Sequence, residues 1–443
     1  MAIATRYSTP LTMLIAAHTL GCKLNFAETS HLMRQMAEQG HTIVDFSDKA
    51  DLYIVNTCTV TAMAEKKCRN AVRQAVALNP SARVAVIGCF AQRAADTIAA
   101  MPGVTLVLGN DRKHLLPQML ATDPTLSSTL PSTRDADTTD FDTNADFQLQ
   151  YSTGDRTRSF LKIQDGCDYF CTYCAIPFAR GRSRSATVEQ TIKAAQQIAH
   201  SGATEIVLTG VNTGTFGQQH GQQLIDLLRR LDDIEGIARY RISSIEPNLL
   251  TDEIIDFVAT SRAFLPHFHI PLQAGTDRLL RAMHRRYTTA LYSQKLQTIK
   301  SLMPDACIAA DIMAGFNGED EAEFDKAKAF VASLPISYLH VFTYSERPGT
   351  AALRQEGRID IATRRAHTQQ MLLLSDKKHR DFINSQLGKV RPVLWESTPH
   401  SNQSLMLGWT DNYIRLCRPF SDTMIGKIES VVIKPDNIAA ESV

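Results

Sequence analysis

The order of apolar and polar positions divides the first 120 residues into short apolar runs separated by amphipathic stretches. These runs have the length of strands and are apolar throughout, as strands covered on both faces are. One helical pattern spans Ala27–Gln39 and ends at Gly40, and another ends at Leu78, before an Asn-Pro pair. Strands that alternate with helices predict an α/β domain with a parallel sheet over residues 1–120. The strand-like runs are residues 13–17, 52–56, 83–87 and 104–108.

The same alternation returns over residues 155–384. Helical stretches such as Val188–His200, behind a Thr187/Gln190 capping box, and Asp252–Ala259 separate six further apolar runs. Six such units predict an incomplete (β/α)6 barrel, and sites on barrels of this kind gather at the carboxyl ends of the strands. The runs are residues 160–163, 205–209, 240–243, 268–270, 308–313 and 338–343.

Beyond this barrel, a long amphipathic helix over residues 362–387 ends at Gly388 and is followed by short strand-like runs. Turns are expected at 409–412 and 419–422, so residues 385–443 are predicted to form a small β-barrel. Between the two α/β parts, residues 121–154 hold six Asp against one Arg and no Lys, with many Thr and Ser. This composition predicts an acidic, solvated linker.

Bulk composition limits the possible settings of the protein. The chain has 443 residues, 44% of them hydrophobic, a net charge of +1 and an odd number of cysteines, nine. Nine cysteines without a disulfide framework favour a reducing compartment, so cytoplasmic localisation is expected. No apolar run reaches the ~18 residues of a membrane span, and the stretch before Cys22 is a poor match to a lipoprotein signal because His18 interrupts it.

Three cysteines in the word Asp165-Gly-Cys-Asp-Tyr-Phe-Cys-Thr-Tyr-Cys-Ala175 carry the strongest chemical signal. Cys167, Cys171 and Cys174 form a C-x3-C-x2-C run directly after the first strand of the predicted barrel. A 4Fe-4S cluster normally takes four thiolates, so three leave one iron open for chemistry. A zinc site would need a second Cys or His pair near by, and a ferredoxin a fourth Cys close in sequence; neither follows.

Three other cysteines end strands of the first domain. Cys22, Cys58 and Cys89 each follow one of its apolar runs. A single buried Cys is usually an inert core residue, but the carboxyl ends of parallel strands meet at one edge of a sheet, where ligands bind. We therefore expect a second three-thiolate cluster site here, and interpret Cys68, Cys307 and Cys417 as non-ligands.

Together these features resemble the methylthiotransferases of the radical S-adenosylmethionine (SAM) superfamily, over nearly the whole chain. The terminal module resembles their RNA-binding TRAM domain. Four words most resemble the branch that acts on N6-threonylcarbamoyladenosine in tRNA. They are Gly21-Cys-Lys-Leu-Asn25, Ile176-Pro-Phe-Ala-Arg-Gly-Arg-Ser-Arg-Ser185, Arg241-Ile-Ser-Ser-Ile-Glu-Pro247 and Tyr344-Ser-Glu-Arg-Pro-Gly-Thr350.

The resemblance implies two 4Fe-4S clusters, SAM, and no catalytic side chain beyond the six cluster cysteines. The cluster of Cys22, Cys58 and Cys89 would carry the sulfur, which one SAM methylates. A second SAM, on the other cluster, would yield the radical that removes hydrogen from C2 of the adenine beside the anticodon. A radical suits this step, because an aromatic C–H offers neither an acidic proton nor a leaving group.

Further binding residues are expected at the barrel strand ends. The residues expected to contact SAM are Thr209, Gly210, Ser243, Ser244 and Gln273 at these strand ends, and Tyr173 between two cluster cysteines. A turn at Gly210 and a helix cap at the serines are the competing interpretation. Arg180, Arg182 and Arg184 are expected to bind phosphate or the threonylcarbamoyl carboxylate. A charge run is more often a solvated face. A second basic group is weaker, and contains Arg278, Arg281, Arg285 and Arg286.

Two features depart from the pattern of the family, and alternatives for the substrate and the function remain open. Asn317 stands where the family commonly has Pro, and the six Lys/Arg from Lys389 onward only match six Asp/Glu. The substrate could instead be isopentenyladenosine in tRNA or an aspartate of a ribosomal protein, and a non-enzymatic iron–sulfur carrier or RNA-binding module is the alternative of another class. Expected partners are the tRNA anticodon loop and a reductant such as flavodoxin or ferredoxin; the sulfur donor stays open and no membrane is involved.

Overall fold

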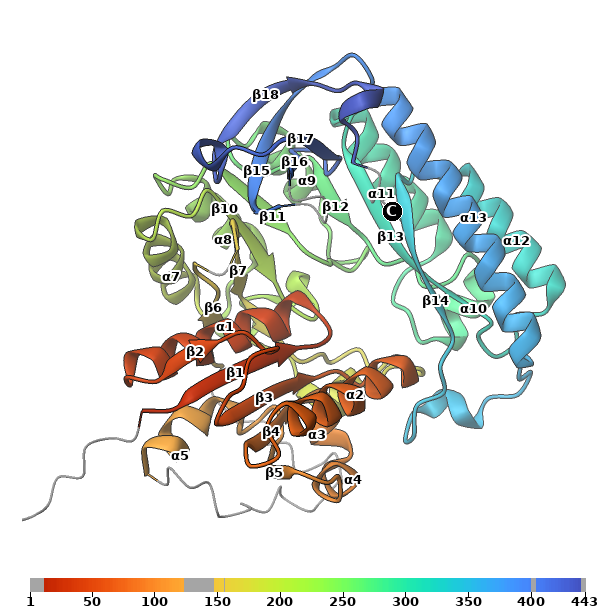
Figure 1. Ribbon diagram of the computed structural model, residues 1–443. Coiled ribbons are helices and arrows are strands. Elements are labelled where there is room, and N and C mark those ends of the chain that lie inside the picture. The colour runs from red at the N-terminus through yellow and green to blue at the C-terminus, as the bar shows by residue number, and fades with distance from the viewer. Residues whose placement is uncertain (1–11, 123–146, 155, 400–403, 440–443) are drawn as a thin grey trace, which may run out of the picture. The chain divides into compact units, whose positions relative to one another are not determined.

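The structure, a computed structural model, describes residues 12–122, 147–154, 156–399 and 404–439 (Figure 1). The chain divides into two compact units. The first comprises residues up to Gln150 together with Ala175–Gly181, and the second comprises Tyr151–Cys174 and the chain from Arg182. Most of the predicted linker lies outside the described residues, and the predicted domain boundaries stay predictions.

A five-stranded parallel sheet with strand order β2-β1-β3-β4-β5 forms the centre of the first unit. The parallel sheet predicted for this part is therefore confirmed, with the short edge strand β2 in addition. The strands are β1 (Leu14–Thr19), β2 (Thr42–Val44), β3 (Leu52–Thr57), β4 (Arg83–Gly88) and β5 (Val104–Leu108). The helices are α1 (Lys23–Glu38), α2 (Ala62–Leu78), α3 (Cys89–Arg93), α4 (Ala95–Ala99), α5 (Leu116–Thr122) and α6 (Ile176–Arg180).

Helices cover both faces of this sheet because successive strand residues point to opposite sides. Ile15 and Ile54 pack on one face with α1 and α5. Tyr53 and Val55, one residue along, pack on the other face with α2, α3 and α4. Both faces are apolar, which explains why the strands read as unbroken apolar runs.

Six parallel strands in two sheets form the partial barrel of the second unit (Figure 1). One sheet has the order β11-β10-β7-β6 and the other β12-β13-β14, and a parallel bridge between Tyr240 and Phe264 adds an edge contact. The six are β7 (Arg158–Lys162), β10 (Glu205–Thr209), β11 (Arg239–Ile242), β12 (His267–His269), β13 (Cys307–Ala314) and β14 (Tyr338–Thr343). The capping box at Thr187 and Gln190 starts α7 (Val188–His200), as predicted.

Short strands and surrounding helices complete the barrel. The strands are β6 (Gln150–Tyr151), β8 (Gln164–Asp165) and β9 (Arg184–Ser185). The helices are α8 (Leu224–Asp232), α9 (Asp252–Thr260), α10 (Asp277–Ala282), α11 (Thr289–Leu302), α12 (Glu321–Ser333) and α13 (Ile361–Gln386). In the described part of the chain, every helix is too short or too polar to cross a lipid bilayer.

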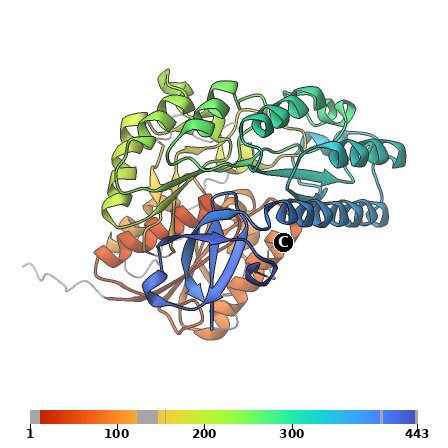
Figure 2. The ribbon, with the colours of Figure 1, turned by 90° about the horizontal axis from the view of Figure 1, so that it is seen from above.

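The terminal module is a four-stranded antiparallel sheet of order β17-β16-β15-β18, consistent with the predicted small barrel (Figure 2). Its core contains Trp395 and Met406 and extends to Phe382 of α13. The turn predicted at 409–412 is confirmed but begins two residues later, at Asp411, because β16 continues through Thr410. The strands are β15 (Val390–Pro399), β16 (Leu405–Thr410), β17 (Arg415–Pro419) and β18 (Ile428–Val432).

Candidate cluster sites

Cys22, Cys58 and Cys89 lie at the carboxyl ends of three neighbouring strands of the first unit. Cys22 precedes α1 after β1, Cys58 follows β3 directly, and Cys89 begins α3 directly after β4. The order β1-β3-β4 in the sheet places these strand ends side by side. The sheet therefore gathers three cysteines that lie 36 and 31 residues apart in the sequence at one edge.

The chain approaches Cys58 so closely at Gly21 that only glycine fits. A Cβ on Gly21 would lie 2.9 Å from the Cβ of Cys58 and 3.2 Å from its Sγ, and φ is +104°. The Asn25 amide holds this arrangement, since its Nδ2 donates to the Leu20 oxygen at 2.7 Å and to the Thr57 oxygen at 3.0 Å. The word Gly21-Cys-Lys-Leu-Asn25 thus fastens the loop of one cysteine to the strand end of the next.

The three sulfurs lie close enough for the charge of one to shift the pKa of another. Burial above all, and further the charges of Cys89 and Cys22, raise the pKa of Cys58 to about 12. Cys22 is reached by solvent, yet desolvation by the surrounding protein raises its pKa, and the Arg180 charge opposes that rise. Metal ligation requires the thiolate, so a metal bound here would have to displace the protons that these raised pKa values retain.

A buried polar network lies behind Cys89. Asn110 donates from Nδ2 to the Cys89 Sγ at 3.3 Å and to the Ala179 oxygen of α6 at 2.7 Å. Its Oδ1 accepts from Lys113 Nζ at 2.7 Å, and Lys113 also pairs with Glu28. A hydrogen bond to a ligand sulfur is one of the means by which a protein sets the potential of an iron–sulfur cluster.

Arg180, expected at the substrate, belongs to this network in the first unit. Its side chain is 1% exposed, and its guanidinium pairs with Glu28 at 3.1 Å and donates to the Asn25 Oδ1 at 2.5 Å. These contacts engage Arg180 within the protein, and its contact with substrate stays a prediction.

The C-x3-C-x2-C loop of the second unit follows β8. Backbone bonds fold it: Cys174 N donates to the Cys171 oxygen at 2.9 Å, and Phe170 adopts φ = 47°, which is rare for a residue with a side chain. Thr172 ties the loop to the end of α10, where its Oγ1 donates to the Ala282 oxygen at 2.9 Å. Cys171 and Cys174 are thus held in one turn of the loop, which begins at Cys167.

Arg285 supplies the main charge beside this loop. It donates to the Cys171 Sγ at 3.1 Å and to the Tyr173 hydroxyl at 3.4 Å, and it pairs with Glu246. Burial raises the pKa of Cys171, and the Arg285 charge opposes that rise. The sequence placed Arg285 in the weaker basic group and did not single out Glu246, which lies in the word Arg241–Pro247 that carries the family resemblance.

Four of the six residues expected to contact SAM lie at barrel strand ends: Thr209 and Gly210 at the end of β10, and Ser243 and Ser244 at the end of β11. Ser243 follows β11, and its buried Oγ has no hydrogen-bond partner among the described residues. The same holds for both amide atoms of Asn212, which follows β10. Orphaned buried polar atoms of this kind fit a bound polar ligand. A Cβ on Gly210 would lie 3.0 Å from the Gln164 Oε1, so a side chain at this position would require Gln164 to shift.

The other residues of the expected set have internal contacts. Thr209 Oγ1 donates to the Leu161 oxygen at 3.2 Å, and the Ser244 oxygen accepts from Thr213 Oγ1 at 2.8 Å. Gln273 has φ = 66°, and its backbone N donates to the Asp311 oxygen at 2.8 Å. Their contacts with SAM stay predictions.

Arg182 and Arg184 stay with the second unit. Arg182 is exposed, pairs with Asp168 at 3.4 Å and covers the Phe170 ring at 4.7 Å. Arg184 lies 3.5 Å from Asp165. Of the second basic group, Arg286 covers the Tyr169 ring at 4.0 Å. These arginines border the cysteine loop.

Two of the three other cysteines lie in apolar cores. Cys68 is buried among the apolar residues under α2, and its Sγ donates to the Cys58 oxygen at 3.7 Å. Cys307 belongs to the core shared by α13 and the terminal sheet.

Comparison with known proteins places this arrangement in a class. Residues 161–331 match a family model described as the radical SAM superfamily, and residues 14–109 match one described as uncharacterized protein family UPF0004. A solved structure of the radical SAM methyltransferase TsrM from Kitasatospora setae has a TM-score of 0.54 at 12% identity, with 74% of this chain and 72% of that chain covered. The fold and the cysteine loop define a radical SAM enzyme, a class that uses a 4Fe-4S cluster and SAM.

Relatives that are similar in sequence show to which family of radical SAM enzymes the chain belongs. A Bacillus subtilis protein named threonylcarbamoyladenosine tRNA methylthiotransferase MtaB is 37% identical over 95% of this chain and 93% of its own length. Its Aquifex aeolicus namesake is 34% identical over 95% of this chain and all of its own length. A tRNA-2-methylthio-N(6)-dimethylallyladenosine synthase from Dictyoglomus thermophilum is 31% identical over 94% of each chain. The chain belongs to the methylthiotransferase family of radical SAM enzymes.

Proposed function

We propose that the enzyme attaches a methylthio group to C2 of N6-threonylcarbamoyladenosine beside the anticodon of tRNA. The identity with relatives named for this reaction, 37, 34 and 32% over 95% of the chain, is the observation that carries the proposal. Relatives named for the dimethylallyl substrate are 27–31% identical. That margin supports the threonylcarbamoyl substrate over the dimethylallyl one.

We further propose that Cys22, Cys58 and Cys89 hold a second 4Fe-4S cluster. Their position at three adjacent strand ends and their mutual effect on pKa support this assignment. When bound, such a cluster supplies an open iron for the sulfur that is transferred. Asn25 fastens the backbone beside Cys22 to the backbone beside Cys58, and Asn110 donates one hydrogen bond to Cys89.

In the second unit, Cys167, Cys171 and Cys174 are proposed to hold the cluster that binds SAM. The Arg285 guanidinium offsets thiolate charge at Cys171. Ser243 and Asn212 offer buried donors and acceptors that a polar ligand would satisfy. These side chains bind and orient, while the cofactors supply the radical chemistry.

Substrate selection is assigned to Arg182 and Arg184. The threonylcarbamoyl group ends in a carboxylate, which Arg binds through two parallel hydrogen bonds. Arg182 is 57% exposed and its present partner, Asp168, is 47% exposed, so this ion pair is weak and can be exchanged for a ligand. An apolar dimethylallyl group would gain nothing from these charges.

The remaining partners follow from the same proposal. Anticodon-loop tRNA is the macromolecular substrate, and a flavodoxin or ferredoxin is the expected reductant. A cytoplasmic setting agrees with nine cysteines that are all free of disulfides in the structure.

Nucleoside mass spectrometry tests the substrate. In digests of tRNA from cells that lack the gene, the methylthio form of threonylcarbamoyladenosine should vanish, and the unmodified form should accumulate. The wild-type gene and the control Cys417→Ala should restore it, whereas Cys58→Ala and Cys171→Ala should not. Loss of the methylthio form of isopentenyladenosine from these digests, or of methylthio-aspartate from peptide digests of the ribosomal proteins, would assign the other substrates.

The non-enzymatic alternative requires a separate test with the purified protein. Anaerobically reconstituted and reduced protein should hold about eight irons and convert SAM to 5′-deoxyadenosine. A count of about four irons per chain would contradict the proposal of a second cluster. Absence of 5′-deoxyadenosine would indicate an iron–sulfur carrier or an RNA-binding module.

A further inference from the structure

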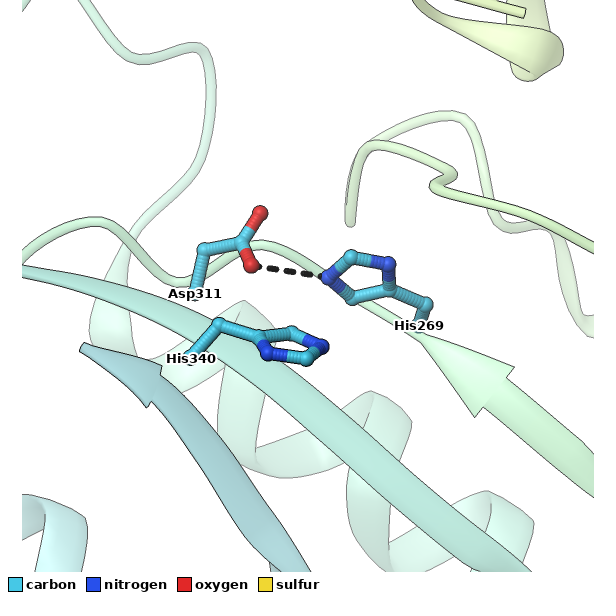
Figure 3. Close-up of side chains that lie close together, drawn as sticks. All are labelled: His269, Asp311 and His340. Atoms are coloured by element: carbon cyan, nitrogen blue, oxygen red, sulfur yellow. Dashed lines mark hydrogen bonds and ion pairs between the residues drawn. The ribbon is translucent and has the colours of Figure 1, made fainter. Parts of the chain in front are cut away.

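Two histidines and an aspartate of the second unit converge on one side of the sheet β12-β13-β14 (Figure 3). Asp311 lies directly opposite His340 in the register of β13 and β14. His269 pairs with Ala309, two residues before Asp311, so it shares a face with Asp311. The three side chains therefore meet because of the strand register.

The distances are those of a ligand set. His269 Nε2 lies 2.8 Å from the Asp311 Oδ1. One ligand atom from each of the three residues lies within 4.8 Å of the other two, and no other group of His, Cys, Asp and Glu in the described ranges meets this condition. The rings of His269 and His340 have centroids 5.2 Å apart at 63°, so their edges and not their faces approach.

Charge and exposure suit a cation that enters from solvent. Burial would raise the pKa of Asp311, but the charge and hydrogen bond of His269 and the charge of His340 outweigh it and lower the pKa. Asp311 is thus a carboxylate at neutral pH. The side chains of His269 and Asp311 are 21% and 18% exposed and His340 is exposed, which leaves a path for an ion.

A third positively charged group near Asp311 is Arg285, which has an acidic partner of its own. Arg285 also acts on Asp311, but Glu246 neutralises Arg285 in a direct ion pair. A metal ion bound here would replace the protons that His269 and His340 carry when they are charged.

We propose that His269, Asp311 and His340 bind one divalent transition-metal ion of the zinc or ferrous type, separate from the cysteine-bound clusters. Two imidazoles and one carboxylate are a common ligand set for such ions, and three protein ligands leave a position open for water or another oxygen donor. Ligand atoms bonded at about 2.1 Å to a tetrahedral ion stand roughly 3.4 Å apart. The ligand atoms of the three residues lie within 4.8 Å of one another, so small rotations of the side chains bring them to this spacing.

Zinc uptake by the intact holoenzyme tests the site. Protein with its clusters assembled is incubated with excess Zn²⁺ and desalted, and zinc and iron are counted by mass spectrometry. The expected result is one zinc per chain with the iron count unchanged. X-ray absorption at the zinc edge should show only nitrogen and oxygen neighbours at about 2.0–2.1 Å and no sulfur at about 2.3 Å.

Variants identify the ligands. Asp311→Asn keeps the size of the side chain, and His340→Ala changes an exposed residue, so each should keep its iron while zinc binding weakens by more than about 100-fold. His200→Asn, at an exposed histidine outside the group, should bind zinc as the wild type does. Zinc with sulfur neighbours, no retained zinc, or equal zinc in all variants would overturn the site and leave a structural hydrogen bond between His269 and Asp311.

Discussion

The Nδ2 of Asn110 donates a hydrogen bond to the Sγ of Cys89 at 3.3 Å. Asn110 itself is fixed, because Lys113 donates to its Oδ1 and its Nδ2 also reaches the Ala179 oxygen. A donor held this firmly stabilises negative charge on the sulfur, and the reduced state of a cluster carries more of that charge.

Replacement of Asn110 by Ala should therefore lower the reduction potential of the proposed cluster on Cys89. If about 1 kcal/mol of the hydrogen bond is specific to the reduced state, the potential falls by roughly 40 mV, since 59 mV is a factor of ten for one electron. Redox titration followed by electron paramagnetic resonance measures the change. Asn70→Ala, at an exposed position of α2, is the control, and equal potentials in both variants would contradict a role for the hydrogen bond.

The buried ion network of the first unit should be costly to break at Glu28. Glu28 is fully buried and pairs with both Arg180 and Lys113. Glu28→Ala leaves two buried cations unpaired and should reduce the free energy of unfolding by ~3–5 kcal/mol. Arg182→Ala, at an exposed arginine two residues from Arg180, should leave that free energy nearly unchanged. Denaturant titrations of both variants measure the difference, and equal midpoints would show that the network does not stabilise the unit.

The convergence of Cys22, Cys58 and Cys89 could be predicted because it depends only on strand order and on the edge at which parallel strands end. The contact between Asn110 and Cys89 could not, because it links positions 21 residues apart through side-chain packing. No local pattern of the sequence encodes such a contact.

The arginine run shows the opposite case. Arg180, Arg182 and Arg184 stand at alternate positions of one short segment, and all three are predicted to bind phosphate or the threonylcarbamoyl carboxylate. Gly181 has φ = 75°, and it ends α6 before Arg182. Arg180 therefore belongs to a helix of the first unit, whereas Arg184 belongs to β9 of the second unit. The regular spacing of the arginines in the sequence did not reveal this change of backbone geometry at Gly181.

Arg182 should affect substrate binding more than turnover. Removal of a charge-assisted hydrogen bond to the threonylcarbamoyl carboxylate should raise KM for tRNA about tenfold to a hundredfold, with kcat little changed. Steady-state kinetics with tRNA bearing the threonylcarbamoyl group measures this. Arg229→Ala, which breaks a similarly exposed ion pair with Glu253, should leave KM unchanged. A fall in kcat alone would place Arg182 outside substrate recognition.

Glu205 joins the barrel to the terminal sheet through two arginines. Its carboxylate, fully buried, lies 2.8 Å from Arg241 Nε and 3.7 Å from Arg239 Nη1. Arg241 donates to the Thr410 oxygen at 2.7 Å, and Arg239 donates to the Pro392 oxygen at 2.6 Å. The charge of Glu205 thus holds the guanidinium groups that bind the backbone of the terminal module.

This arrangement predicts a pH-dependent effect of Glu205→Gln. Burial would raise the pKa of Glu205, but the charges of Arg241 and two further arginines outweigh it and hold the pKa below its usual 4.5. A lowered pKa in the folded state stabilises the fold above pH 4.5, and this stabilisation is lost as the pH falls through the folded-state value. At neutral pH the free energy of unfolding of the wild type should exceed that of the variant by ~3–5 kcal/mol. This difference should become smaller in acid. Parallel denaturant titrations of both proteins from pH 7 downward measure the difference, since cluster loss in acid affects both alike. A difference that stays constant with pH would mean that Glu205 acts by its shape and not by its charge.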